Sequence, residues 1–147
     1  MEKLYRKYLI RLRVVRESRA KLNQTNSPEA VVDCIKKEMQ SLDREYLVVV
    51  LLDTRNNVVG IEEVAKGTLN AAPFSSREIF KSAMLCNAQS IILFHNHPTG
   101  DPTPSEQDIE TTKLLKKASE IMQIDLIDHI IVGINGTYLS MKEKGVL

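Results

Sequence analysis

The feature that most constrains the fold is a buried strand that runs directly into a stiff loop. Residues 91–94 are all apolar and predict the strand, and His95 and His97 follow at its end. Side chains alternate along a strand, so the two histidines lie on one face. The loop at 98–104 contains three prolines, which restrict its conformations. The chain is therefore expected to present two imidazoles from the end of a buried strand, beside a rigid loop.

A capped helix is predicted to follow this loop. Thr103 is expected to be its N-cap, Pro104 its first residue, and Glu106 the partner that completes a capping box. Ser105 and Asp108 are three residues apart, so they share one face of the helix. The stiff loop would bring this face, with its hydroxyl and its carboxylate, back over the two histidines.

His95, His97 and Asp108 would then form a three-ligand metal site with a fourth position open to water. This is the arrangement of a catalytic zinc rather than of a closed structural zinc. An isolated H-x-H pair is more often a chance or surface feature, but the buried strand, the rigid loop and the capped helix together favour a metal. Asp101 is a rival carboxylate ligand, although it lies between prolines with no helix to orient it.

The rest of the chain alternates between strand and helix patterns. Asn135-Gly136 is a strong signal for a hairpin between the last two strands. The pattern predicts an α/β fold, a mixed β-sheet flanked by helices, in a single domain of residues 1–147. Within it, 1–44 would form an N-terminal strand and helix, and 45–147 the core that carries the motif. The expected elements are strands at 7–16, 45–53, 58–64, 91–94, 124–132 and 138–140, and helices that begin at 27 and 75 and span 103–122.

The helix patterns also predict a cap and several buried positions. Ser75 and Glu78 match a capping box, and Met122 is expected to face the core. Cys34 and Cys86, the only cysteines, occupy apolar helical positions and belong to no C-x-x-C pair. They are expected to be small buried side chains in a reducing cytosol, so a cytoplasmic location is predicted.

Composition places the chain among ordinary globular proteins. Of its 147 residues 43% are hydrophobic and 27% charged, and no apolar run approaches a membrane span, so no membrane contact is expected. The basic N-terminus lacks an apolar core with a cleavage site and is not a secretory signal. The net charge is only +1, yet residues 1–21 contain eight Lys and Arg against two Glu. This asymmetry suggests weak nucleic-acid contact, although a solvated strand face is the more ordinary explanation.

The motif and its flanking segments resemble a known family. The string Phe94-His95-Asn96-His97-Pro98, followed by a serine and an aspartate three residues apart, resembles the JAMM metalloprotease signature of MPN-type domains. The resemblance runs from about Glu45 to the C-terminus. It implies the layered MPN fold, related to that of cytidine deaminases, in a short form without the helix-hairpin-helix region that RadC proteins often carry. The segments that are similar more narrowly to the RadC family are 67–70, 77–81, 92–100 with Pro104, Ser105 and Asp108, and 128–133.

The resemblance also implies roles for individual residues, with the three ligands named above holding Zn²⁺. Glu45, at the start of an earlier core strand, would be the general base and proton shuttle, with Glu62 or Glu63 as the alternatives. Ser105 would donate a hydrogen bond to a developing oxyanion. The ordinary alternatives are a surface role for Glu45 and a helix-terminal role for Ser105. His129 is expected to make a supporting hydrogen bond and not to be a ligand.

Taken together, these features favour a zinc-dependent hydrolase of the JAMM type that cleaves peptide or isopeptide-like amide bonds through a metal-activated water. Its expected partner is a peptide or protein substrate, and a homo-oligomer is left open. The alternative is a RadC-like accessory protein, associated with DNA repair or mobile elements, with weak or no peptidase activity. A zinc deaminase is excluded because it requires a P-C-x-x-C motif, which the chain lacks.

Overall fold

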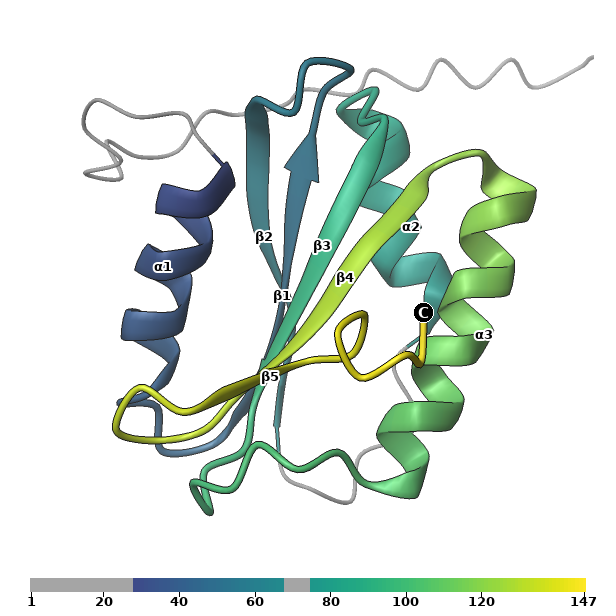
Figure 1. Cartoon of the computed structure of the whole chain (residues 1–147). Helices are drawn as coiled ribbons and strands as arrows, with labels where there is room; N and C mark the ends of the chain where they lie inside the picture. Colours follow the sequence, from purple (N-terminus) through teal and green to yellow (C-terminus); the bar gives the residue numbers. More distant parts are fainter. Residues whose placement is uncertain (1–27, 68–74) are drawn as a thin grey trace, which may run out of the picture.

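The computed structural model describes residues 28–67 and 75–147 (Figure 1). The described strands form one five-stranded sheet in the order β2-β1-β3-β4-β5. The predicted α/β architecture, a mixed sheet flanked by helices, is therefore confirmed. The elements are α1 (Pro28–Met39), β1 (Glu45–Leu52), β2 (Val58–Gly67), α2 (Ser76–Leu85), β3 (Ser90–Asn96), α3 (Glu106–Met122), β4 (Asp125–Val132) and β5 (Tyr138–Ser140).

The strand directions bring three chain segments to one edge of the sheet. Strand β1 is antiparallel to both β2 and β3, so the start of β1 lies beside the end of β3, where Leu47 pairs with His95. Strands β3 and β4 are parallel, and α3 is the crossover between them. The first turn of α3 therefore returns to the end of β3. The predicted hairpin joins β4 to β5, with φ values of 53° at Asn135 and 81° at Gly136, as a type I′ turn requires.

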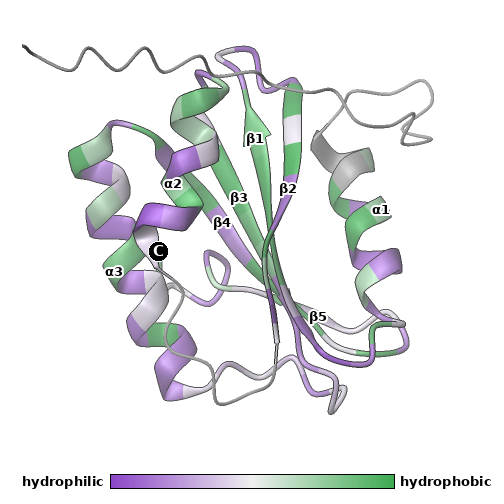
Figure 2. Cartoon of the chain, turned by 180° about the vertical axis from the view of Figure 1, so that it is seen from behind, coloured by the Kyte–Doolittle hydropathy of each residue, from purple (hydrophilic) through white to green (hydrophobic). Residues whose placement is uncertain are grey.

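Helices cover both faces of the sheet, with α1 on one side and α2 and α3 on the other (Figure 1). Figure 2 shows that the central strands are the most hydrophobic part of the molecule, and every residue of β3 is buried. Alternation along the strands divides the core in two. The α2 and α3 face contains Leu47, Val49, Leu51, Ile91 and Leu93, and the α1 face contains Val50, Leu52, Ile92, Phe94, Ile130 and Val132.

Helix α3 begins two residues later than the sequence suggested. Its N-cap is Ser105, and the capping box is closed by Asp108 at the third helical position, so the predicted box of Thr103 with Glu106 is wrong. The Thr103 hydroxyl instead donates to the Asp101 carboxylate at 2.7 Å. The shift matters because the residue that closes the box is the proposed carboxylate ligand.

Smaller predictions about the helices also need correction. Ser75 is the N-cap of α2, but its side chain makes no capping hydrogen bond, and Glu78 pairs instead with Lys81. Cys34 and Cys86 are half-buried rather than buried. Met122, the last residue of α3, is 38% exposed rather than buried.

Two predictions concern the N-terminal part of the chain. The strand at 7–16 and the basic segment 1–21 both lie outside the described residues. Within the described part, no helix is long and apolar enough to span a membrane.

Candidate metal centre

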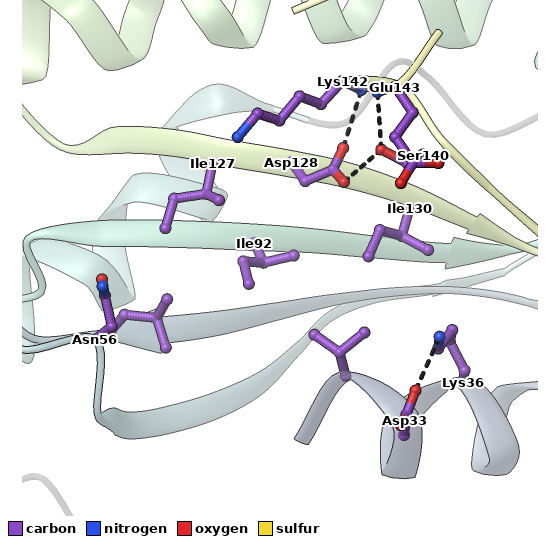
Figure 3. Close-up of a pocket in the computed structure, with 12 residues that line it drawn as sticks. Asp33, Lys36, Asn56, Ile92, Ile127, Asp128, Ile130, Ser140, Lys142 and Glu143 are labelled. Carbon is purple, nitrogen blue, oxygen red and sulfur yellow. Dashed lines mark hydrogen bonds and ion pairs between the residues drawn. The ribbon is translucent and has the colours of Figure 1, made fainter. Parts of the chain in front are cut away.

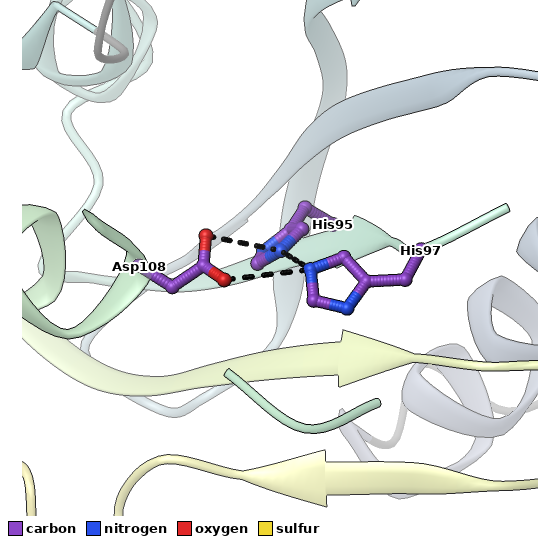
Figure 4. A group of neighbouring side chains, drawn as sticks. All are labelled: His95, His97 and Asp108. Atoms are coloured by element: carbon purple, nitrogen blue, oxygen red, sulfur yellow. Dashed lines mark hydrogen bonds and ion pairs between the residues drawn. The ribbon is translucent and has the colours of Figure 1, made fainter. Parts of the chain in front are cut away.

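The end of β3 and the start of α3 bring His95, His97 and Asp108 together (Figure 4). The Nε2 atoms of the two histidines are 2.9 Å apart. Asp108 Oδ1 lies 3.4 Å from the Nε2 atom of His95, and Asp108 Oδ2 lies 3.4 Å from the Nε2 atom of His97. The three side chains named from the sequence therefore form one cluster at the edge of the sheet.

The loop after β3 orients the His97 ring. His97 Nδ1 lies 2.8 Å from the backbone carbonyl oxygen of Asp101, which only accepts, so Nδ1 carries the proton and Nε2 faces the cluster. The Asp101 carboxylate accepts from the backbone N–H and the hydroxyl of Thr103, so this rival ligand is directed elsewhere. Asp101 thus contributes its carbonyl group to the site, a role that its side-chain type did not indicate.

The β4–β5 hairpin supports this loop. The Ile134 N–H donates to the Gly100 carbonyl oxygen at 3.2 Å, and the Gly133 N–H donates to the Thr137 carbonyl oxygen at 2.9 Å. A Cβ atom on Gly133 would come within 2.3 Å of both the Gly100 carbonyl oxygen and the Thr137 hydroxyl oxygen. The loop and the hairpin can pack this closely only because residue 133 is glycine.

A third histidine, on the neighbouring strand β4, holds the His95 ring. His95 Nδ1 lies 2.8 Å from His129 Nε2, and His129 Nδ1 lies 2.7 Å from the Thr112 hydroxyl. His95 and His129 are only 2% and 1% exposed. Burial lowers the pKa of His129 to about 4, and burial together with the neighbouring His129 holds the pKa of His95 well below its usual value. Both rings are therefore neutral near pH 7, the form of imidazole that binds metals.

The capping box of α3 fixes the Asp108 carboxylate. Its Oδ2 accepts from the backbone N–H of Ser105 at 2.8 Å and from the Ser105 hydroxyl at 2.7 Å. Burial raises the pKa of Asp108, but His97, His95 and these Ser105 hydrogen bonds lower the pKa more, so the carboxylate is ionised across the physiological range. The positive end of the helix dipole favours the same charge. Ser105 thus has the helix-terminal role considered from the sequence, while its oxyanion role stays a prediction.

The cluster can hold a metal ion. Two neutral imidazole nitrogens and one carboxylate oxygen converge, and the candidate ligand atoms all lie within 4.8 Å of one another. Such electron-rich atoms repel one another unless a cation lies among them, and divalent transition metals accept this donor set. Without a metal ion, a proton can take part of its place. The hydrogen bond to Asp108 raises the pKa of His97, so His97 holds a proton more readily than a free imidazole does.

Glu45 is the predicted glutamate that lies closest to the histidines. It is the first residue of β1, half-buried, and continuing the register of β1 and β3 would place it opposite His97 on the face toward α3. Burial raises the pKa of Glu45, with His97 opposing the rise and Asp108 adding to it, so Glu45 is electrostatically coupled to the cluster.

The two alternative glutamates lie farther from the cluster on β2. Glu62 pairs with Val49 on β1, and Val49 pairs with Leu93 on β3. Glu62 therefore lies on the same face of the sheet as His95. It is level with Leu93, two residues before His95, and it lies two strands away. Glu63 pairs with Val48 and faces the α1 side. Their positions favour Glu45, whose catalytic role stays a prediction.

Sequence reasoning missed Thr112, which lies one helical turn after Asp108. Its hydroxyl donates to the Asp108 carbonyl oxygen at 2.7 Å and also contacts the His129 ring. A hydroxyl residue four positions after a ligand on a helix can return to that ligand's carbonyl, so the spacing was a usable signal. The contact with His129 carried no such signal, because it depends on how α3 packs against β4.

A cavity of about 800 Å³ lies on the opposite face of the sheet, against α1 (Figure 3). Ile92, Ile127 and Ile130 line its floor. Asp33 forms an ion pair with Lys36 on its rim. The cavity is separated from the His95 cluster by the sheet itself, so it is no part of the candidate metal centre.

The fold and the cluster define an α/β protein with a candidate mononuclear metal centre at the end of a buried central strand. Residues 25–146 match the family model described as a RadC-like JAB domain, and the chain belongs to this family. The resemblance found in the motif and its flanking segments is thereby confirmed.

Several relatives carry the name UPF0758 protein. The chain is 46% identical over 122 residues to one from Desulfitobacterium hafniense, covering 83% of this chain and 53% of the relative. It is 48% identical over 121 residues to one from Clostridium kluyveri and 49% identical over 121 residues to one from Clostridium beijerinckii, covering 82% of this chain and 53% and 52% of those relatives. The chain therefore spans about half the length of the curated relatives it matches.

Proposed function

We propose that the chain is a zinc-dependent hydrolase of the JAMM type that cleaves peptide or isopeptide-like amide bonds. The observation that carries the proposal is the convergence of His95 Nε2, His97 Nε2 and the Asp108 carboxylate at one point. The two rings are turned by hydrogen bonds so that each directs Nε2 inward. A purely structural cluster would have no need to orient three lone-pair donors toward one another.

The donor set and spacing fit zinc. Tetrahedral zinc with Zn–N distances of ~2.0–2.1 Å separates its ligand atoms by about 3.3 Å. The separations in the cluster are 2.9 Å between the two Nε2 atoms and 3.4 Å from each Nε2 to an Asp108 oxygen. Three protein ligands leave a fourth position for water. When bound, zinc would supply Lewis acidity and lower the pKa of that water toward ~7.

Glu45 would move the protons. Its half-buried carboxylate lies on the face of the site, and burial raises its pKa, so it binds a proton more readily than an exposed glutamate does. It would take a proton from the attacking water and return it to the nitrogen of the leaving amine. Keeping Glu45 out of the ligand set leaves the water position open.

Ser105 would serve the site in two ways. Its backbone N–H and hydroxyl both hold Asp108 Oδ2 in place. The side chain is exposed, so the hydroxyl could also rotate and donate to the oxyanion that develops on the substrate carbonyl. The oxyanion role and one of the two hydrogen bonds to Asp108 require the hydroxyl group at this position.

Substitution of Glu45 tests the mechanism. Glu45→Gln should keep the fold and the bound zinc but lower hydrolysis of a peptide or isopeptide panel by ~10²–10⁴, the usual contribution of general acid–base catalysis. Glu62→Gln and Glu63→Gln are matched controls on β2 and should change the rate little. Full turnover by Glu45→Gln, or loss of its zinc, would show that the role is wrongly assigned.

Turnover of amide substrates by the zinc-loaded protein separates the two candidate functions. Hydrolysis of any panel member by the zinc-loaded wild type, lost on chelation and restored by zinc, supports the hydrolase. A wild type that binds zinc but turns over no amide substrate would favour the accessory protein. The basic segment 1–21 would then be tested with labelled DNA at rising salt, because phosphate-driven binding weakens steeply with salt.

A further inference from the structure

Thr112 and His129 lie outside the candidate ligand set, but their hydrogen bonds connect two of its members, Asp108 and His95. We propose that these two residues form a positioning relay that fixes His95 in its Nδ1–H tautomer and so sets the metal affinity of the centre. The inference deepens the proposed function and rests on it for the identity of the metal. The relay runs from the Asp108 backbone through Thr112 and His129 to the His95 ring.

The direction of the first hydrogen bond is fixed by chemistry. The Asp108 carbonyl oxygen has no proton, so the Thr112 hydroxyl must donate to it across 2.7 Å. The single hydroxyl hydrogen is then committed. The 2.7 Å contact between the Thr112 oxygen and His129 Nδ1 therefore requires that His129 Nδ1–H is the donor.

The remaining directions follow from that choice. A neutral imidazole carries one N–H, so His129 Nε2 is unprotonated and accepts. The 2.8 Å contact between the two rings therefore requires His95 Nδ1–H to donate. His95 Nε2 is left unprotonated on the side that faces His97 and Asp108, which is the state needed for a metal ligand.

Burial makes the relay effective. Thr112, His129 and His95 are 0%, 1% and 2% exposed, so bulk water has little access to replace a lost partner. The relay also starts on the backbone of the residue whose carboxylate belongs to the same cluster. The position of α3 and the tautomer of a ring on β3 are thus coupled through one chain of hydrogen bonds.

Four variants of the full chain test the relay. Thr112→Val removes the hydroxyl with little change of shape, and Thr111→Val is the matched control at the neighbouring buried position outside the relay. His129→Leu removes the acceptor for His95. His129→Gln is the rescue variant, because its amide oxygen can accept where His129 Nε2 did. Circular dichroism establishes which variants fold.

Two measurements are made on each folded variant. The first is long-range ¹H–¹⁵N correlation NMR of the metal-free protein at alkaline pH, which reports which His95 nitrogen carries the proton. The second is zinc affinity by competition with a chromophoric chelator. Wild type, Thr111→Val and His129→Gln should show His95 protonated at Nδ1 and bind zinc within about threefold of one another. Thr112→Val and His129→Leu should lose the Nδ1–H preference and bind zinc roughly 10–100-fold more weakly, as loss of a ligand's hydrogen-bond partner does elsewhere.

The two proposals fail in different ways. An unchanged His95 tautomer and unchanged zinc affinity in Thr112→Val and His129→Leu would overturn the relay and leave the hydrolase proposal intact. A wild type that binds no zinc would overturn the metal proposal, while the tautomer change in Thr112→Val would still support the relay. The relay would also be overturned if His129→Gln and His129→Leu lost zinc affinity equally while His95 kept its Nδ1–H in both variants.

Discussion

Two aspartates on opposite faces of the sheet show how a closed polar network differs from an open one. On the α1 face, Asp128 Oδ1 accepts from the backbone N–H of His129. Oδ1 also accepts from the backbone N–H of Lys142, and Oδ2 accepts from the Ser140 hydroxyl (Figure 3). On the α3 face, Asp108 Oδ2 accepts from Ser105, while Oδ1 points at an unprotonated ring nitrogen of His95 (Figure 4). Both carboxylates are partly buried, yet of the two only Asp128 has hydrogen-bond donors on both oxygens among the described residues.

This difference helps to distinguish a carboxylate that stabilises the fold from one that is available to bind a ligand. A buried carboxylate that is fully hydrogen-bonded to its own chain needs nothing more and stabilises the fold. A carboxylate and two imidazoles that converge through lone pairs are unfavourable until a cation joins them. His129 lies between the two networks, since its backbone N–H donates to Asp128 and its ring contacts His95.

The largest effects are expected when the ligands of the open network are removed, with Asp128 of the closed network as the control. Asp108→Asn should weaken zinc binding by well over the roughly 100-fold that loss of an outer hydrogen-bond partner costs. His95→Ala with His97→Ala should abolish zinc binding, as elemental analysis would show. Asp128→Asn should bind zinc as the wild type does but lose about 1–3 kcal/mol in urea unfolding, because it disturbs satisfied hydrogen bonds. Full zinc occupancy in the double histidine variant, or zinc loss in Asp128→Asn, would reverse the comparison.

The pH dependence of stability tests the histidine between the networks. The pKa of His129 is about 4 in the folded protein, below an unfolded value of ~6.5, so the unfolded chain binds the proton first. The contribution of His129 to the stability of the metal-free protein should therefore be constant above pH ~6.5 and fall by about 3 kcal/mol as the pH decreases toward 4. His95 acts in the same direction. The raised pKa of His97 acts in the opposite direction, so the wild type is compared with a His129 variant. His129→Gln should flatten this slope in urea titrations at several pH values, and an undiminished slope would contradict the assignment.

Gly133→Ala tests the support of the open network alone. The new methyl group would meet the Gly100 carbonyl oxygen and the Thr137 hydroxyl at 2.3 Å, so the loop that orients His97 must shift. Overpacking of this kind costs about 1–3 kcal/mol, and zinc affinity should fall with stability. Gly67→Ala is the control, because no atom of residues 28–67 or 75–147 lies within 4 Å of its added Cβ. Equal thermal unfolding of the two variants would refute the close packing.

The smallest effect is expected at the helix cap. Ser105→Ala removes a cap worth about 1 kcal/mol, and it also frees Asp108 Oδ2, so both stability and zinc affinity should decrease. Glu106→Ala removes the side chain that the sequence placed in the capping box with Thr103, and it should change stability by less than about 0.5 kcal/mol. Chemical denaturation of both variants distinguishes the two caps, and a larger loss of stability in Glu106→Ala would favour the box of Thr103 with Glu106.

Much of the fold was predictable because it follows from local periodicity and turn chemistry. The apolar run before His95 specified a buried strand, and Asn135-Gly136 specified the hairpin. The same-face placement of His95 and His97 follows from the two-residue period of a strand. The cap of α3 was not predictable by pattern, since Thr103 and Ser105 both begin plausible capping sequences. The observed hydrogen bonds of Asp101 and Asp108 decide between them.

The sequence by itself determined the residue types of the candidate centre, the strand that carries the two histidines and the helix that carries Asp108. Only the tertiary structure decided which nitrogen of each ring faces inward. That choice depends on the Asp101 carbonyl for His97, and on His129 and Thr112 for His95. These contacts join segments whose proximity is set by the order of strands in the sheet and by the packing of α3 on β4, which local periodicity does not encode.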